Sequence, residues 1–427
     1  MHAFKTGFCK RVSKFSYIMF LDSLLYDAVS SNTKSLNALS INTKVKYNIE
    51  ITKQGIDQRY TPEGVKYVQT LWSALLSAQL NRSIEAGWFS EFERVLIKDS
   101  TKFEVSGNLA KQLPGTGGSA SKAGVCIQYE FDIKSGEVND LSIGPATSHD
   151  KSDAKNTLGK IRKGDLILRD LGYSVIPCFK TINEKGAYFI SRLAANILVF
   201  ERINNELIEI DFPKLYKKMT VCNIKRLSKN VIIGDKAQMP VRLIIDLMPE
   251  QEINKRKRQT KENNKERGHK ANSKFMNRVY FNLFITNIDE KMLEPKIITR
   301  IYKLRWQVEI IFKTWKSIFG IASISPMKYE RLMCLLNVRL LLILINWELF
   351  MHKRCQVFEA TQKLLSIMKC FKTMHEHNNE LRHILTDNCK KLSSWSQRIS
   401  KLLESKHWLE KKNKKIGFME IMMLNVF

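Results

Sequence analysis

Two short apolar runs that each end in an aspartate constrain the fold of this chain more than any other feature. Val95-Leu96-Ile97 is closely followed by Asp99, and the run 166–168 is closely followed by Asp170. Short aliphatic runs bounded by polar residues are typical of buried strands. The sequence therefore predicts two strands, each with an acid at its end.

The segment between these two runs has the pattern of a hairpin followed by a helix. Residues 125–132 and 141–143 are apolar runs with a turn at Ser135-Gly136 between them, as in a β-hairpin. Residues 152–163 place apolar side chains at helical spacing and predict a helix. Strand, hairpin, helix and strand in this order predict an α/β fold.

The two ends of the chain have a helical pattern, and the part between them is rich in short strands. Before residue 90, apolar residues recur at helical spacing and polar or basic residues fill the other faces. Short apolar runs separated by polar turns continue from 176 to 285, and the chain is helical after 287. The helical start suits a DNA-binding module, and a purely structural bundle is the alternative that this pattern leaves open.

The chain carries a large excess of positive charge. Its 70 Lys and Arg residues against 42 Asp and Glu residues give 70 − 42 = +28 over 427 residues. Such an excess favours association with polyanions, so nucleic acid is the first partner to consider. The most hydrophobic stretch, 340–345, is far shorter than the roughly 20 residues that span a bilayer. We therefore expect a buried helix there and a soluble, cytoplasmic protein with no membrane partner.

Cysteine and histidine form no metal-binding pattern. The eight cysteines are scattered without a C-x-x-C motif, and we interpret them as reduced thiols. His375 and His377 are two positions apart, a spacing that does not place two ligands on one helix face.

The densest basic run begins with Lys255, Arg256, Lys257 and Arg258. Between residues 254 and 278 there are ten Lys or Arg residues and two acids. We predict a basic loop that contacts DNA phosphates. Each such contact would steepen the slope of log affinity against log salt concentration by about 0.9. A solvated face or a mobile loop without a ligand is the alternative interpretation.

One helix near residue 300 gathers polar residues on a narrow stripe. At about 100° per residue, Tyr302, Arg305, Glu309 and Lys316 fall together on one side. The apolar side chains form a separate, buried face: Leu304, Val308, Ile311 and Trp315. An exposed stripe with an Arg305–Glu309 ion pair is the alternative, and the two aspartates at strand ends argue against it.

Acids with cations beside them suit phosphodiester chemistry. Hydrolysis or transfer of a phosphodiester places charge on the attacking and leaving oxygens, and two Mg²⁺ ions about 3.5–4 Å apart neutralise both. Mg²⁺ prefers hard oxygen ligands and keeps several waters, so a few carboxylates are enough. Cations such as Arg305 and Lys316 would hold DNA phosphates next to such ions.

These residues match the motifs of a known family. The spacing Tyr302-x2-Arg305-x3-Glu309-x6-Lys316 resembles the Y-(2)-R-(3)-E-(6)-K signature of the DDE transposases of bacterial insertion sequences, in the fourth insertion-sequence family. Asp99-Ser100-Thr101 resembles the first acidic motif of that family. Asp170-Leu171-Gly172-Tyr173 resembles the second.

The resemblance implies an RNase H-like catalytic core with a β-rich insertion, flanked by helical N- and C-terminal regions. It also implies that Asp99, Asp170 and Glu309 are catalytic metal ligands for two Mg²⁺ ions, with Mn²⁺ as a substitute. Tyr302 and Arg305, together with Lys316, would contact phosphates at the transposon end. The implied partners are the terminal inverted repeats, target DNA and a second copy of the chain in a synaptic dimer.

The expected reaction is cut-and-paste transposition through a hairpin intermediate, in a cytoplasmic, nucleoid-associated protein. A catalytically inactive or repurposed DNA-binding derivative is the alternative, and a generic structure-selective nuclease is a third class. The expected segments are a helical DNA-binding domain, the first part of the core, the insertion with the basic loop, the second part of the core and a C-terminal helical region: 1–90, 91–175, 176–280, 281–345 and 346–427.

Overall fold

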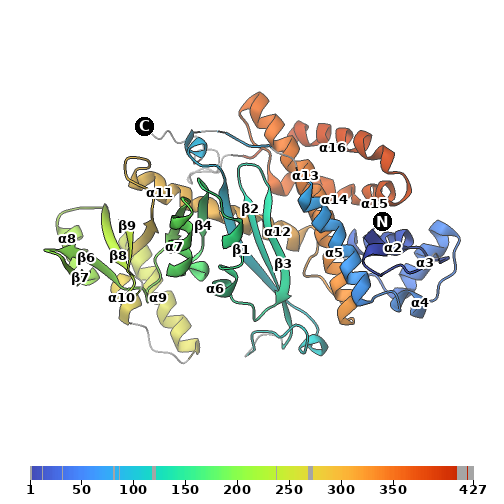
Figure 1. Cartoon of the computed structure of the whole chain (residues 1–427), viewed down its shortest axis with the longest axis horizontal. Coiled ribbons are helices and arrows are strands. Elements are labelled where there is room, and N and C mark those ends of the chain that lie inside the picture. Colours follow the sequence, from blue (N-terminus) through green and yellow to red (C-terminus); the bar gives the residue numbers. More distant parts are fainter. Residues whose placement is uncertain are drawn as a thin grey trace. The chain divides into compact units, whose positions relative to one another are not determined.

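The computed structural model divides the chain into two compact units (Figure 1). It describes residues 2–421 apart from 12, 31, 80–81, 86, 118–121, 237, 268–272 and 411–420. The first unit comprises Met1–Ile84, Ser100–Ser148 and Trp306–Met419, and the second comprises Glu85–Asp99, His149–Arg305 and Glu420–Phe427. The expected segments are thus distributed over both units, and strand β1 (Val95–Glu104) passes from the second into the first.

The second unit contains a mixed sheet with the strand order β1-β4-β5-β10-β9-β8-β6-β7. Its strands after β1 are β4 (Leu166–Arg169), β5 (Tyr188–Arg192), β6 (Val199–Ile203), β7 (Glu206–Glu209), β8 (Arg226–Ile233), β9 (Met239–Leu247) and β10 (Phe281–Thr286). Strand β4 is parallel to both β1 and β5, and the pairs from β5 to β7 are antiparallel. The predicted strands 95–97 and 166–168 are confirmed and lie next to each other.

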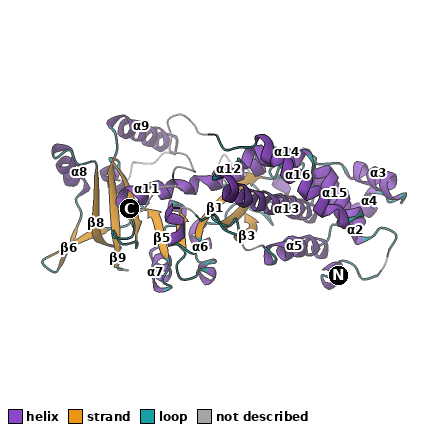
Figure 2. Cartoon of the chain, turned by 90° about the horizontal axis from the view of Figure 1, so that it is seen from above, coloured by secondary structure: helices purple, strands orange, loops and turns teal. Residues whose placement is uncertain are grey.

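Helices cover both faces of this sheet, whose strands are orange in Figure 2. The helices of the second unit are η1 (Gly87–Glu91), α6 (Asp150–Asp153), η3 (Leu158–Lys160), η4 (Leu171–Tyr173), α7 (Ile176–Glu184), α8 (Phe212–Val221), α9 (Glu250–Arg267), α10 (Ser273–Arg278), α11 (Pro295–Ile301) and η5 (Tyr302–Trp306), which ends in the first unit. Apolar residues of α7 and α8 join one core with Leu96 and Ile167. The opposite face carries α11 and η5, where Tyr302 packs edge-on against Phe284 at 5.1 Å.

The first unit is built around the long helix α13 (Tyr329–Thr361). Its other helices are α1 (His2–Lys5), α2 (Tyr17–Ala28), α3 (Leu36–Tyr47), α4 (Lys53–Asp57), α5 (Pro62–Ser77), η2 (Gly107–Leu109), α12 (Gln307–Ser317), α14 (Ile367–Glu376), α15 (Asn378–Asp387), η6 (Cys389–Lys391) and α16 (Leu392–Lys406). Helix α13 contacts α2, α5, α14 and α16, so the helices from both ends of the chain share one core. Trp72 of α5 donates a hydrogen bond to Asn337 of α13 (2.7 Å).

Within the described residues, α13 is the one helix long and apolar enough to cross a membrane by length and composition. In this helix, 83% of the most apolar window is buried inside the structure. The core helices of compact proteins pass the same test. The prediction of a buried helix at 340–345 is confirmed, since this stretch lies within α13 and five of its six residues are buried.

The predicted hairpin is confirmed, and the predicted helix after it is wrong. Strands β2 (Gly124–Asp132) and β3 (Val138–Pro145) pair antiparallel in the first unit. Their turn needs glycine at position 136, where φ is +78° and a Cβ would collide with Met351. Residues 152–163 do not form one helix: the chain makes only the short turns α6 and η3 there. Buried cations of the neighbouring strands bond to this segment, and those contacts replace a helical ladder.

A buried ion pair ties the two ends of the chain together in the first unit. Asp22 of α2 accepts two hydrogen bonds from Arg382 of α15, both 2.8 Å, and one from Lys46 of α3 (2.9 Å). Burial alone would raise the pKa of Asp22, but the bonds from Arg382 and Lys46 lower it below its usual value. The stabilisation is therefore present at neutral pH and is lost as the pH falls through the lowered pKa.

We expect Arg382→Met to lower the free energy of unfolding by about 3–5 kcal/mol, because it leaves the Asp22 carboxylate buried without its main partner. Urea unfolding followed by circular dichroism measures this change. Arg398→Met is the matched control, since Arg398 pairs with Glu380 at an exposed position and should cost less than about 1 kcal/mol. Equal losses in both variants would contradict a structural role for the Asp22 pair.

Candidate active site

The two predicted aspartates lie on neighbouring strands in the second unit. Strands β1 and β4 are parallel, with Lys98 and Arg169 as Cα partners. The residues that follow them, Asp99 and Asp170, therefore lie at the same level. The predicted strand end is right for Asp170, which directly follows β4, and wrong for Asp99, because β1 continues past it to Glu104. Both point to the face opposite the α7 core, because side chains alternate along a strand and Leu96 belongs to that core.

One guanidinium group contacts both carboxylates. Arg305 Nη1 donates to Asp99 Oδ2 (2.8 Å), and Arg305 Nε lies 3.7 Å from Asp170 Oδ1. The side chain of Arg305 is only 16% exposed, so the contact with Asp99 is shielded from water. The structure thus brings together one residue of each acidic motif and one of the signature.

Tyr302 completes this cluster from the sheet side. Its hydroxyl donates to Asp170 Oδ1 over 3.4 Å, and its ring is buried against Phe284. Burial raises the pKa of the phenol, and the charge of Asp170 raises it further. Tyr302 therefore stays protonated at neutral pH and acts as a hydrogen-bond donor.

The backbone around the signature is not the single α-helix that the sequence predicted. Residues Tyr302–Trp306 form the 3₁₀ helix η5, and α12 begins at Gln307. In a 3₁₀ helix residues three apart eclipse each other, so Tyr302 and Arg305 face the same side. The buried face was predicted correctly: Leu304, Val308, Ile311 and Trp315 are each at most 1% exposed.

The other two signature residues lie on α12 in the first unit. Glu309 is in the first turn of α12 and has an exposed side chain. Lys316 is in the last turn, and its Nζ donates to the carbonyl of Lys102 (3.1 Å). Between them, Trp315 packs edge-on against Tyr129 of β2 at 4.9 Å and anchors α12 to the hairpin.

The donor chemistry of Asp99 and Asp170 fits a divalent ion. Both supply hard carboxylate oxygens, and a cationic group already lies against both of them. Among the described residues, no three His, Cys, Asp or Glu side chains gather closely enough to hold a metal together. A metal held by this pair would therefore need a third ligand or water.

The predicted basic loop is a helix, because residues 250–267 form α9. Arg256 is used within the fold: it donates to the carbonyl of Phe281 (2.9 Å) and to the side chain of Asn282 (2.8 Å), and burial lowers its pKa. Lys257 lies over the ring of Tyr280 at 4.6 Å. Lys255 and Arg258 are exposed. Of the four predicted DNA contacts, these two are the best placed to meet a phosphate.

Three buried ionic residues near the aspartates were not assigned a role from the sequence. Asp165, which directly precedes β4, is buried and accepts two hydrogen bonds from Arg94 (2.7 and 2.9 Å). Lys98 and Arg169 are buried directly before Asp99 and Asp170. The available signal was a basic residue immediately before the acid in both motifs.

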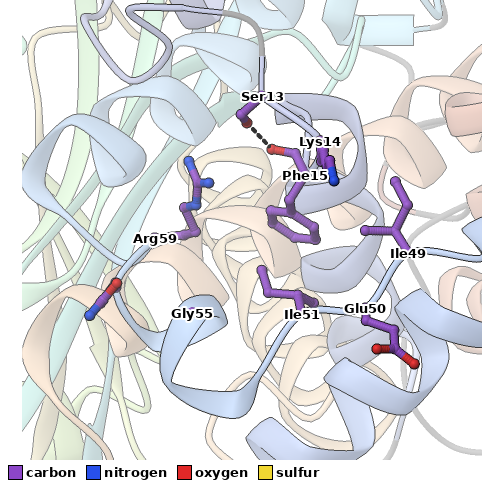
Figure 3. A pocket seen from close by; sticks show the side chains of 9 residues that line it. Ser13, Lys14, Phe15, Ile49, Glu50, Ile51, Gly55 and Arg59 are labelled. Carbon is purple, nitrogen blue, oxygen red and sulfur yellow. Dashed lines mark hydrogen bonds between the residues drawn. The ribbon is translucent and has the colours of Figure 1, made fainter.

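A cavity of about 490 Å³ lies elsewhere, among the N-terminal helices of the first unit (Figure 3). Phe15 points into it, and the hydroxyl of Ser13 donates to the Phe15 carbonyl (2.6 Å). Its lining contains none of the predicted site residues: Ser13, Lys14, Phe15, Ile49, Glu50, Ile51, Gly55, Gln58 and Arg59.

Comparisons with known proteins identify the family of this chain. The sequence model of the family described as "Transposase DDE domain" matches residues 90–345, more than half of the chain. The chain is 28% identical to the transposase for insertion sequence element IS231B of Bacillus thuringiensis subsp. berliner, over 94% of this chain and 87% of that protein. It is 30% identical to the transposase for IS231F of Bacillus thuringiensis subsp. israelensis, over 77% and 72%. The transposase for IS1151 of Clostridium perfringens is 28% identical, over 79% and 75%.

We expect Arg256→Met to lower the free energy of unfolding by about 1.5–3 kcal/mol, because it removes charged hydrogen bonds between α9 and β10. Thermal and urea unfolding measure this loss. Arg258→Met, on the exposed side of the same helix, should change stability by less than about 0.5 kcal/mol. If the two variants were equally stable, Arg256 would not be a structural residue.

Proposed function

Because the chain belongs to the family of transposases with a DDE domain, we propose that it cuts an insertion sequence from DNA and joins it to a target. The observation that carries this proposal is the contact of Arg305 with both Asp99 and Asp170. It joins residues from two acidic motifs and from the signature that are far apart in the sequence. The parallel order β1-β4-β5, with Asp99 on β1 and Asp170 directly after β4, supports an RNase H-like core.

In this proposal Asp99, Asp170 and Glu309 hold two Mg²⁺ ions, which Mn²⁺ can replace. Such ions supply activation of water and neutralisation of charge on the attacking and leaving oxygens. Glu309 follows Arg305 by four residues, which is why we assign it as the third acid. Its exposed position in the first turn of α12 leaves the carboxylate accessible.

The signature residues would position the DNA end. Arg305 presents a planar guanidinium group suited to a phosphate as well as to a carboxylate. Tyr302, which stays a neutral phenol, would keep Asp170 oriented or donate to a phosphate oxygen. Lys316 supplies an ammonium group about two helix turns beyond Glu309. These roles require a DNA phosphate next to η5 and α12.

The proposed reaction sequence is the one that the resemblance to the family implies. Water attacks the phosphodiester at the transposon end and leaves a 3′-hydroxyl on the element. That hydroxyl attacks the opposite strand, which forms a hairpin end and releases the flanking DNA. A second water opens the hairpin, and the regenerated 3′-hydroxyl attacks a phosphodiester of the target. Each step breaks one phosphorus–oxygen bond and forms another, so no redox partner is needed.

The partners in this proposal are the terminal inverted repeats, target DNA and a second copy of the chain. A net charge of +28 supports binding to a polyanion. The two transposon ends must be held together so that both can be joined to one target. A synaptic dimer provides one active site for each end. We place this activity in the cytoplasm, with the protein associated with the nucleoid.

We expect Glu309→Gln to keep binding to the inverted repeats within about twofold and to slow their cleavage in Mg²⁺ by about a thousandfold, since a metal ligand contributes several kcal/mol. Gel-shift and cleavage assays with end-containing DNA measure the two effects. Glu359→Gln, an exposed glutamate of α13, is the matched control and should cut at the normal rate.

Three outcomes would contradict the proposal in different ways. Normal cleavage by Glu309→Gln would remove this residue from the site. Wild-type protein that binds ends without cutting them would be a repurposed DNA-binding derivative. Cleavage that does not need the inverted repeats, and that is never followed by joining, would indicate a structure-selective nuclease.

The exposed side of α9 gives a separate prediction for DNA affinity. We expect Lys255→Gln with Arg258→Gln to reduce the slope of log affinity against log salt concentration by about 1.8, from about 0.9 for each phosphate contact. Fluorescence anisotropy at several salt concentrations measures the slope. Lys217→Gln with Lys218→Gln, on the exposed side of α8, removes the same charge elsewhere. Equal changes in both double variants would show that net charge alone matters.

A further inference from the structure

A buried basic residue directly precedes each of the two aspartates. Lys98 is 0% exposed and Arg169 is 1% exposed, and the two are Cα partners on adjacent parallel strands. Their side chains share the face of Leu96 and Ile167, which belong to the apolar core against α7. At this level each strand therefore has a carboxylate on one face and a buried cation on the other.

Both cations bond to the same short segment of chain. Lys98 Nζ lies 2.5 Å from Asp153 Oδ2. Arg169 donates from Nη1 to the carbonyl of Ala154 (3.0 Å) and from Nη2 to the hydroxyl of Thr157 (2.7 Å). Residues 153–157 contain little regular secondary structure, and these side-chain bonds add to the backbone turn bonds that hold the segment.

The same segment supports the turn that carries Asp170. Tyr173 of η4 packs with Ala154 and with Cys178 of α7 in one small core. Asp150 lies so close to Gly172 that a Cβ at position 172 would come within 2.9 Å of its Oδ2. A movement of the 150–157 segment would therefore displace η4, and Asp170 is the N-cap residue of η4.

If positions 98 and 169 contributed only to stability, buried apolar side chains would stabilise the fold there at least as well as the cations do. Burying a cation requires partners that replace its water, and a buried ion pair is often no more stabilising than a well-packed apolar group. Leu96 and Ile167, two residues earlier on the same face, show that apolar residues fit there. The cations add directional bonds that fix the position of one particular segment.

We propose that Lys98 and Arg169 are positioning residues that fix the separation of the Asp99 and Asp170 carboxylates for a divalent ion. They act by clamping the 153–157 segment beneath η4. This inference rests on the proposed function, because it takes the two aspartates as ligands. Neither cation touches the DNA or the reacting atoms in this role.

The test is Mn²⁺ binding to the full-length protein without DNA, measured by electron paramagnetic resonance, beside cleavage and end binding. We expect Lys98→Met and Arg169→Lys to weaken Mn²⁺ binding by about tenfold or more, as loss of residues behind metal ligands commonly does. The rate of cleavage should fall in parallel and recover in part at high Mn²⁺ concentration. The affinity of both variants for transposon ends should stay within twofold of the unmodified protein.

Arg94→Met is the matched control. Arg94 is also buried and directly precedes β1, and its partner Asp165 directly precedes β4, but Arg94 and Asp165 lie five residues before Asp99 and Asp170 respectively. The control should lose stability without losing Mn²⁺ affinity. Arg169→Lys keeps the charge and provides a milder variant where Lys98→Met does not fold, and all binding is measured below the unfolding transition of each variant.

The outcomes separate this inference from the proposed function. If Asp99→Asn and Asp170→Asn abolish Mn²⁺ binding while Lys98→Met and Arg169→Lys leave it unchanged, the positioning role is wrong and the site stands. An equal loss of affinity in Arg94→Met would reduce the effect to general destabilisation and also overturn the inference. If neither asparagine variant alters Mn²⁺ binding, the proposed metal site itself fails.

Discussion

Repulsion between two carboxylates on adjacent strands is the constraint around which the candidate site is arranged. Asp99 and Asp170 directly follow two Cα partners of the parallel strands β1 and β4, so a positive group near both relieves the repulsion. In the structure this group is the guanidinium of Arg305. The 3₁₀ helix η5 contains both Arg305 and Tyr302, and the buried ring of Tyr302 packs η5 against the sheet.

The two strands are also held from the opposite face. Lys98 and Arg169 bond to a segment that has almost no helical structure of its own. Cationic side chains thus lie on both faces of these two strands. Arg305 bonds to the carboxylates, whereas Lys98 and Arg169 bond to the 153–157 segment. A site that holds metal ions needs ligands at defined separations, and irregular turns need such bonds to remain in place.

The first unit shows a different use of buried charge. Asp22, Lys46 and Arg382 join helices from opposite ends of the chain, and Trp72 joins α5 to the long helix α13. The N-terminal helices, for which we predicted DNA binding, therefore fold with the C-terminal helices as one core. Substitutions in either terminal region will affect the stability of the other, and DNA-binding variants there need a stability control.

The sequence by itself determined the features that depend on local patterns: the strands before Asp99 and Asp170, the hairpin 124–145 and the buried face from Leu304 to Trp315. Only the tertiary structure decided the broken segment 150–160, the helix at 250–267 and the 3₁₀ turn before Glu309. It also decided that Arg256 serves the fold. Periodicity reports which side chains avoid water, whereas partners distant in sequence decide whether a polar residue is bonded inside the protein or left free to bind DNA.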